Sequence, residues 1–448
     1  MNKNTNIFFL LLLFVNAAIG QVNLPVAPST AQIPNYTNKN YNNPNSKNPT
    51  TPATQFIDIR QAQQHQLIMQ EVEQNEKQRA ETLSQIKNDI DEVSSSESYN
   101  LPAHSNEKGA EFYRNVFDKM LLLNIENYSV KDVNFDIENA YFENKLDKEE
   151  FDKTIKQIAQ FILAKMKEKN FDLSSNTAKN FVLFEFFSQP MQVKGFKQKH
   201  FPIKYDFEDY WGRQNWSKMF VTKLLKTNTG QCHSMPLLYL TLAEAIGAEA
   251  YLSLSPNHSY IKFQDEKARW YNLELTNGML TVPSFILNNG YITAESMQNK
   301  IYMQNLTKQQ MISQFYTDLA SGYIHKFGYD GFVKKVIDKA LELYPTSINA
   351  NMLKASYDTE HFKYAIKKTG INPETQEGRE KILDYPKAVA LLQEMQKQYK
   401  VIDDLGYQEM TAEAYEKWLS SLKEAKNKQD SEKLSKQIKG LTVKKIKS

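Results

Sequence analysis

Residues 227–247 read TNTGQCHSMPLLYLTLAEAIG and hold Cys232, the one cysteine of this 448-residue chain. Loop-forming residues precede the cysteine. An apolar stripe at helical spacing follows it and ends at Gly247. The pattern predicts a helix that begins close to Cys232 and stops at a glycine cap. Pro236 is tolerated near a first turn and is compatible with a regular helix that starts a residue or two later.

A thiol at a helix N-terminus is a candidate nucleophile. Free N–H groups and the positive end of the helix dipole lower the pKa of such a thiol and favour the thiolate. Composition alone favours the alternative, an inert and buried Cys232, because free cysteines are usually buried. The neighbours of Cys232 therefore decide between the two readings.

After Gly247 the period of the pattern changes from 3.6 to two, which predicts strands. Pro256-Asn257 separates the first strand from the second, and a polar turn at residues 264–267 separates the second from the third. We expect a β-hairpin after the helix. The three predicted strands cover residues 248–254, 258–263 and 268–275.

The register of this hairpin follows from the patterning of its faces. If Gln264 pairs with Ala268, the loop has three residues, His258 lies opposite Glu274, and Asn272 is diagonal to the histidine. Loops of two or four residues would put the polar side chains on opposite faces, so we reject them. In the expected register the other face carries the apolar side chains Ile261, Phe263, Tyr271, Leu273 and Leu275.

Together these residues supply a nucleophile, a base and a group that orients the base. Cys232 provides the thiolate, His258 takes and returns the proton, and Glu274 or Asn272 fixes the histidine tautomer. The separations are 26 residues from Cys232 to His258 and 16 from His258 to Glu274. His233 is disfavoured as the base because adjacent residues on a helix point about 100° apart.

At these positions the chain resembles the transglutaminase-like superfamily, which is related in fold to papain-type cysteine proteases. The matching stretches are Gly230-Gln231-Cys232 with its helix, residues 257–261 (NHSYI) and residues 270–276 (WYNLELT). The resemblance covers roughly residues 205–280. It implies a Cys-His-Asp triad for acyl transfer.

Carried onto this chain, that triad is Cys232, His258 and position 274, where Glu replaces the family's usual Asp. Asn272 offers the amide orienter that papain-like enzymes use. We favour Glu274 and keep Asn272 as the alternative. The resemblance implies hydrolysis as readily as cross-linking.

Residues 205–216 (YDFEDYWGRQNW) lie just upstream of the nucleophile. Enzymes of this kind stabilise the tetrahedral oxyanion with the N–H of the nucleophile and a further donor from upstream. Gln214 and Trp216 are the candidate oxyanion or cleft residues. The alternative is that these side chains only pack around the cleft.

The first 98 residues differ from the rest in composition. Residues 1–20 place Lys3 before a short apolar run and a small-residue exit, which is typical of a secretory signal peptide. We expect an exported chain, periplasmic or extracellular after cleavage, with no transmembrane span in its mature part. Residues 21–56 hold eight Asn and six of the 15 Pro and predict a disordered linker, and residues 57–98 predict a helical segment.

The remainder divides into three predicted parts. Residues 105–300 form the transglutaminase-like domain, and its first half has helical periods. Residues 306–420 form a helical region in which 332–357 resembles one tetratricopeptide-type helix pair, although no second or third copy follows. We favour helices that cap the catalytic domain, with a partner-binding groove as the alternative. The tail at 421–448 is rich in Lys and predicted to be solvated.

Several function classes are disfavoured. A balance of 55 Lys+Arg against 52 Asp+Glu creates no global field for nucleic acid. The seven His and one Cys lack zinc-ligand spacing, and no glycine-rich phosphate loop is present, so we expect neither metal nor cofactor.

The sequence thus predicts an α+β protein in which a nucleophile helix packs on an antiparallel sheet between N- and C-terminal helical extensions. Its expected function is that of an exported cysteine hydrolase or acyltransferase that acts on an amide or peptide bond of a protein or peptide substrate through an acyl-enzyme. The alternative is a non-catalytic scaffold protein with a relic triad and a partner bound at its C-terminal helices.

Overall fold

The computed structural model describes residues 69–83, 99–197, 199–281, 283–287 and 291–424. The predicted signal peptide and linker lie outside these residues. Of the predicted helical segment, residues 69–83 are described and are helical. The chain divides into two units, Met1–Ile86 and Lys87–Ser448, and the second contains every predicted site residue.

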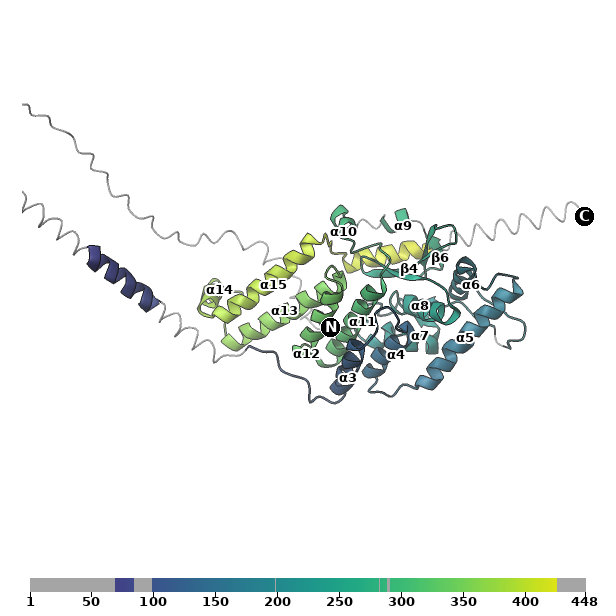
Figure 1. Cartoon of the computed structure of the whole chain (residues 1–448), viewed down its shortest axis with the longest axis horizontal. Coiled ribbons are helices and arrows are strands. Elements are labelled where there is room, and N and C mark those ends of the chain that lie inside the picture. Colours follow the sequence, from purple (N-terminus) through teal and green to yellow (C-terminus); the bar gives the residue numbers. More distant parts are fainter. Residues whose placement is uncertain (1–68, 84–98, 198, 282, 288–290, 425–448) are drawn as a thin grey trace, which may run out of the picture. The chain divides into compact units, whose positions relative to one another are not determined.

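This second unit is mixed α+β and mostly helical, with a small antiparallel sheet (Figure 1). The α+β class is therefore confirmed. The predicted helical half begins the unit, and the side chains of Ser129, Asp147 and Ser175 accept backbone N–H groups at the starts of three of its helices. Its four helices are α3 (Ala110–Leu121), α4 (Val130–Tyr141), α5 (Lys148–Glu168) and α6 (Asn176–Ser188).

A short parallel strand pair brings the upstream segment beside the nucleophile loop. Strand β1 (Lys204–Tyr205) pairs with β2 (Thr229–Gly230), and helices η1 (Trp216–Met219) and α7 (Val221–Thr227) lie between them in sequence. The buried Glu138 carboxylate accepts the first two N–H groups of α7, at 2.7 Å and 2.9 Å. This capping fixes the start of α7 against α4 and hence the approach to β2.

Helix α8 (Ser234–Ile246) is the predicted nucleophile helix. It starts two residues after Cys232, as Pro236 allows, and ends at Gly247, whose φ of 66° is the left-handed conformation of a glycine cap. Both expectations are confirmed. Glu244 and Ala245 are its exposed residues, because α4, α5, α6, α7 and the sheet surround the rest.

The sheet has the order β3-β4-β5-β6 and is antiparallel throughout. Three of its strands correspond to the three predicted ones, and the fourth, β6, was not anticipated. Helix α8 contacts both β3 and β4. The strands are β3 (Tyr251–Ser255), β4 (His258–Gln264), β5 (Trp270–Glu274) and β6 (Met279–Thr281).

The predicted hairpin register is wrong by two residues. Gln264 pairs with Trp270 rather than with Ala268, so the loop has five residues instead of three. Asp265 explains the longer loop, because its Oδ1 accepts the backbone N–H groups of Lys267 and Arg269 at 2.9 Å and 2.8 Å. A shift of two residues leaves every side chain on its predicted face.

The C-terminal helices pack in succession, α11 on α12, α12 on α13 and α13 on α15. The helix pair expected at residues 332–357 is present as α12 and α13. The larger helices are α11 (Lys308–Phe327), α12 (Gly331–Leu343), α13 (Ile348–Thr369) and α15 (Pro386–Asp404), and the shorter ones are α9 (Pro283–Leu287), α10 (Ala294–Gln298), α14 (Gln376–Lys381) and η2 (Ile382–Asp384).

One further helix covers residues 412–424 and is drawn in the brightest yellow near β4 (Figure 1). Its Leu422 is fully buried, so the predicted boundary of a solvated tail at residue 421 is wrong. Residues 425–448 of that tail lie outside the described residues.

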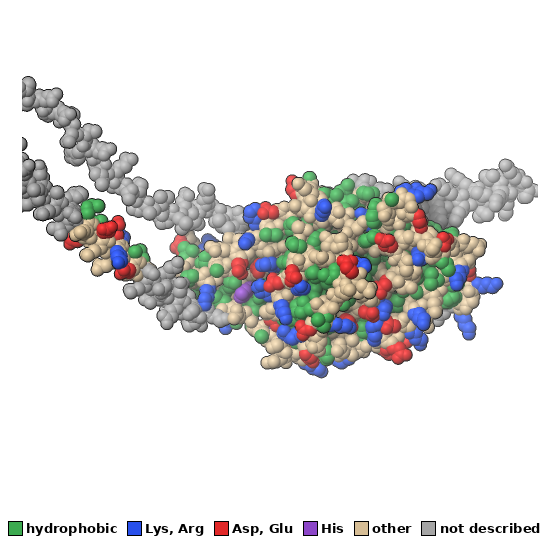
Figure 2. Space-filling view, in the orientation of Figure 1, with side chains coloured by type: hydrophobic (Ala, Val, Ile, Leu, Met, Phe, Trp, Pro, Cys, Tyr) green, Lys and Arg blue, Asp and Glu red, His purple; other side chains and the backbone are tan. Residues whose placement is uncertain are grey.

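Among the residues that the structure describes, no helix is both long and apolar enough to cross a bilayer. On the face seen in Figure 2, Lys and Arg side chains alternate with Asp and Glu side chains over the folded unit.

Substitution of Gly230 by Ala is expected to destabilise the fold. A Cβ at this position would lie 2.5 Å from Leu224 Cδ1 and 2.7 Å from Met235 Cγ. Overpacking of this kind lowers the free energy of unfolding by about 1–3 kcal/mol, measurable by urea denaturation. The control is Gly331→Ala, because no atom lies within 4 Å of the added Cβ. Equal stability of the two variants would contradict the packing argument.

Candidate active site

Cys232 lies in the tight loop between β2 and α8. The N–H of Gln231 donates to Ser234 Oγ at 2.9 Å, which ties the loop to the first residue of the helix. The carbonyl of Cys232 accepts the hydroxyl of Ser259 at 2.5 Å. The cysteine loop is therefore attached to both the nucleophile helix and β4.

His258 and Glu274 form a buried pair. His258 begins β4 directly after the turn at Pro256-Asn257, and Glu274 ends β5. His258 Nε2 lies 2.7 Å from Glu274 Oε2, and the two side chains are 1% and 4% exposed. The other carboxylate oxygen of Glu274 accepts the N–H of Thr276 at 2.9 Å. This second bond fixes the carboxylate that orients the imidazole.

The second ring nitrogen of His258, Nδ1, is buried and has no hydrogen-bond partner among the described residues. The thiol of Cys232 nevertheless interacts with this ring. Burial opposes ionisation of the thiol, but the interaction with the neighbouring His258 ring and the charge of that imidazole outweigh it, so the pKa of Cys232 is lowered.

The pKa of the His258 imidazole is shifted in the opposite direction. Burial alone would lower the pKa of His258, but the negative charge of Glu274, the interaction with Cys232 and the hydrogen bond to Glu274 raise it to about 10. A lowered thiol pKa beside a raised imidazole pKa favours the thiolate–imidazolium pair over the neutral pair.

Asn272, the alternative orienter, does not hold the ring. It is buried in the middle of the sheet, paired with Lys262 of β4 and Thr281 of β6. The carboxylate of Glu274 makes the hydrogen bond to His258 instead. The structure thus brings together Cys232, His258 and Glu274.

The two predicted oxyanion residues are placed elsewhere. Gln214 is exposed, and its N–H donates to Asp209 Oδ2 at 3.0 Å. Trp216 stacks on His325 of α11, with ring centroids 4.1 Å apart. Other residues of the same segment do lie near the site. Tyr205 and Trp211 contact Tyr415, a residue of the helix at 412–424 whose hydroxyl reaches the thiol.

Sequence reasoning missed the side chains that surround the thiol. The hydroxyl of Tyr415 donates to Cys232 Sγ at 3.5 Å and lies 3.5 Å from the hydroxyl of Tyr205. The ring of Trp418 meets His258 edge-on at 4.7 Å. The available signal was the apolar spacing of Tyr415, Trp418 and Leu422, but that spacing does not say which surface the helix covers.

The side chain of His233, which the sequence disfavours as the base, lies beside α11. Its Nε2 lies 3.5 Å from Asp318 Oδ2 of α11. The histidine next to Cys232 is therefore paired with a carboxylate of α11.

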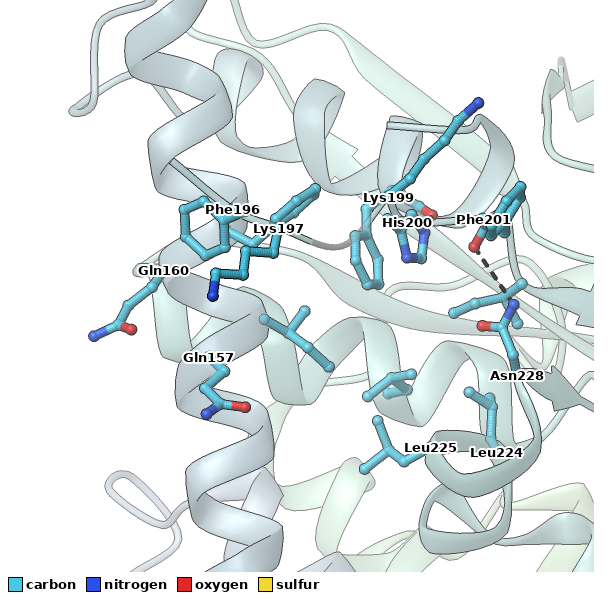
Figure 3. Close-up of a pocket in the computed structure, with 15 residues that line it drawn as sticks. Gln157, Gln160, Phe196, Lys197, Lys199, His200, Phe201, Leu224, Leu225 and Asn228 are labelled. Atoms are coloured by element: carbon cyan, nitrogen blue, oxygen red, sulfur yellow. Dashed lines mark hydrogen bonds between the residues drawn. The ribbon is translucent and has the colours of Figure 1, made fainter. Parts of the chain in front are cut away.

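One pocket has a volume of about 780 Å³, and no triad residue lines it. Figure 3 shows the basic side chains of Lys197 and Lys199 and the ring of Phe196 at this pocket, with Leu224 and Leu225 of α7 on its other side. The ring of His200 stacks on Phe186 with centroids 3.7 Å apart. The pocket is a separate feature from the triad.

Metal ligands do not gather anywhere in the described ranges, where no group of three or more His, Cys, Asp or Glu is placed to hold an ion.

No protein-family model and no curated protein matches the chain. Among solved structures, the crystal structure of menin, described as revealing the binding site for the Mixed Lineage Leukemia protein, is similar with a TM-score of 0.31 and 12% identity. The alignment covers 67% of this chain and 71% of that one. At this TM-score the similarity does not define a shared fold.

Replacement of Glu274 by Gln is expected to lower the pKa of His258 from about 10, because the charge that opposes the burial effect is removed. A ¹³C-edited NMR titration of the imidazole measures this pKa, with His258→Ala as the assignment reference. Asn272→Ala is the matched control and leaves the titration unchanged. A shift in the Asn272 variant and none in the Glu274 variant would reverse the assignment of the orienter.

Proposed function

We propose that this protein is a cysteine hydrolase or acyltransferase that cleaves an amide or peptide bond through an acyl-enzyme on Cys232. The observation that supports this most directly is the buried hydrogen bond of 2.7 Å between His258 and Glu274, next to a thiol whose pKa is lowered. An inert buried cysteine requires neither a charged partner nor an oriented imidazole.

The proposed reaction has two halves. The thiolate of Cys232 attacks the substrate carbonyl, an S–C bond forms, and the carbonyl oxygen takes the negative charge. The C–N bond then breaks, and the leaving amine takes the proton held by His258. In the second half, water or an amine gives a proton to His258 and attacks the thioester, and the S–C bond breaks.

The local architecture supports a transglutaminase-like core as the finer fold assignment. A helix that starts two residues after the cysteine packs on an antiparallel sheet, and the sheet supplies the histidine and the acid in that order. Export through the predicted signal peptide is part of the same proposal. In an oxidising compartment a lone reactive thiol has no disulfide partner within its own chain.

A second candidate is a non-catalytic scaffold that keeps a relic triad and binds a partner at α11–α15. The near-complete burial of His258 and Glu274, 1% and 4% exposed, favours this reading because a substrate cannot reach either side chain in the state described. The two functions differ in whether the thiol is chemically activated.

The pH dependence of Cys232 alkylation tests that difference, and the single cysteine makes the labelling unambiguous. The lowered thiol pKa predicts a midpoint for iodoacetamide labelling below the ordinary 9.0. In His258→Ala the lowering interaction is lost while burial remains, so the midpoint rises. Protein unfolded in urea gives the reference value. Identical midpoints in the wild type and the His258 variant would contradict the enzymatic proposal.

Acyl-enzyme formation is expected on incubation with a mixture of peptides and peptide amides. Intact-mass spectrometry detects the adduct, which is absent in Cys232→Ala and is released by hydroxylamine. His258→Ala lowers the rate of its formation by about 10²–10⁴-fold, the typical contribution of a general base. His233→Ala is the matched control and keeps the wild-type rate, because His233 faces Asp318. Equal losses in both histidine variants would argue against the assigned base.

A further inference from the structure

The helix at residues 412–424 covers the triad with one apolar face. Tyr415, Leu419 and Leu422 are buried and fall at steps of four and three residues, with Trp418 half-buried beside them. Glu413 and Lys417 on the opposite side are exposed. This is the pattern of a helix held by one face.

The buried face of the helix meets the reacting groups themselves. Tyr415 donates its hydroxyl to Cys232 Sγ at 3.5 Å. Trp418 places its ring edge-on to His258, 4.7 Å between centroids. The nucleophile and the base are therefore each covered by a side chain of the same helix.

Both ends of the helix are attached to the loops that carry the triad. The amide of Asn257, the residue before His258, donates to the carbonyl of Met410 at 3.1 Å. The amide of Asn277, just beyond β5, donates to the carbonyl of Leu422 at 3.1 Å. These bonds seat the helix over the site along its length.

The Tyr415 hydroxyl occupies the position that a substrate carbonyl needs. The carbonyl carbon of a substrate must come within about 3–3.5 Å of the sulfur, and Tyr415 Oη, 3.5 Å from the sulfur, fills that space. The same oxygen lies 3.5 Å from the hydroxyl of Tyr205, a buried O–H donor on the upstream strand β1.

We propose that the helix at 412–424 is an intramolecular inhibitor that fills the acyl-donor site, and that its displacement opens a cleft for a peptide with an aromatic side chain beside the reactive carbonyl. The aromatic preference follows from the rings that receive Tyr415, since Tyr210 and Trp211 lie 5.4 Å and 5.0 Å from its ring. This inference rests on the proposed function, because an inhibitor is meaningful only for an active thiol.

The test is the rate of Cys232 alkylation in the full-length chain at a fixed pH. A double variant, Tyr415→Ala with Trp418→Ala, is expected to react about tenfold or more faster than the wild type, because labelling no longer waits for the helix to open. Lys417→Ala, on the exposed side of the same helix, is the matched control with an unchanged rate. An unchanged rate in the double variant overturns the proposal.

A conservative variant and a peptide keep the test decisive if the double variant loses its fold. Tyr415→Phe keeps the ring and removes only the hydroxyl that contacts the sulfur. Because that hydroxyl also lowers the pKa of the thiol, the rate is compared at the high-pH plateau, where the thiol is fully ionised, and is expected to rise several-fold there. A synthetic peptide of residues 411–424 slows labelling of the double variant, and a scrambled peptide does not. No rise in the Phe variant, or equal effects of the two peptides, counts against the inhibitor.

The pH midpoint separates failure of this inference from failure of the proposed function. One outcome is faster labelling in the double variant with a pH midpoint at the ordinary 9.0 that His258→Ala does not change. It would show that the helix shields the thiol, but also that the thiol is not activated. The proposed function and the inhibitor that rests on it would then both be overturned. A low midpoint with no change in rate leaves the enzyme and overturns the inhibitor alone.

Discussion

The hydrogen bond between His258 and Glu274 is the interaction on which the rest of the site depends. Both side chains are almost wholly buried, and a buried charge is costly unless it is paired. The carboxylate makes a positive imidazole tolerable in that environment, and the imidazole in turn lowers the pKa of the Cys232 thiol. Without Glu274 the same burial would favour a neutral ring and a neutral thiol.

The fold supplies this arrangement from three separate stretches of chain. The cap on α7 and the close packing of Gly230 set the loop that carries Cys232. The hairpin of β4 and β5 then brings the histidine and the acid onto one face, and the hydroxyl of Ser259 attaches that hairpin to the carbonyl of Cys232. The distances within the site are thus consequences of backbone contacts rather than of flexible side chains.

Local patterns predicted the elements well. The helix after Cys232, its glycine end and the face shared by His258 and Glu274 all follow from periods of 3.6 and two. The register itself was wrong by two residues because the bonds of the Asp265 carboxylate to the backbone of Lys267 and Arg269 lengthen the loop, and this turn chemistry is not visible in the apolar pattern. Because the register was wrong by an even number of residues, His258 and Glu274 still fell on the same face of the sheet.

Contacts between distant parts of the chain were not predictable. Gln214 and Trp216 were chosen from the right segment, yet Tyr205 and Trp211 are its members near the site. The apolar stripe of the last helix could be seen in the sequence, but nothing local connects Tyr415 with a cysteine 183 residues earlier. An apolar stripe indicates that one face of a helix is buried, but it does not indicate which part of the protein that face packs against.

The thiolate–imidazolium pair is the central claim, and the ultraviolet absorbance of the thiolate near 240 nm measures it most directly, since this signal does not require a reagent to pass the covering helix. The difference between wild type and Cys232→Ala is expected to show thiolate absorbance that develops below the ordinary thiol pKa of 9.0, and this early rise disappears in a His258→Ala background. Absorbance that develops only around the ordinary thiol pKa of 9.0, and equally with and without His258, would contradict the account.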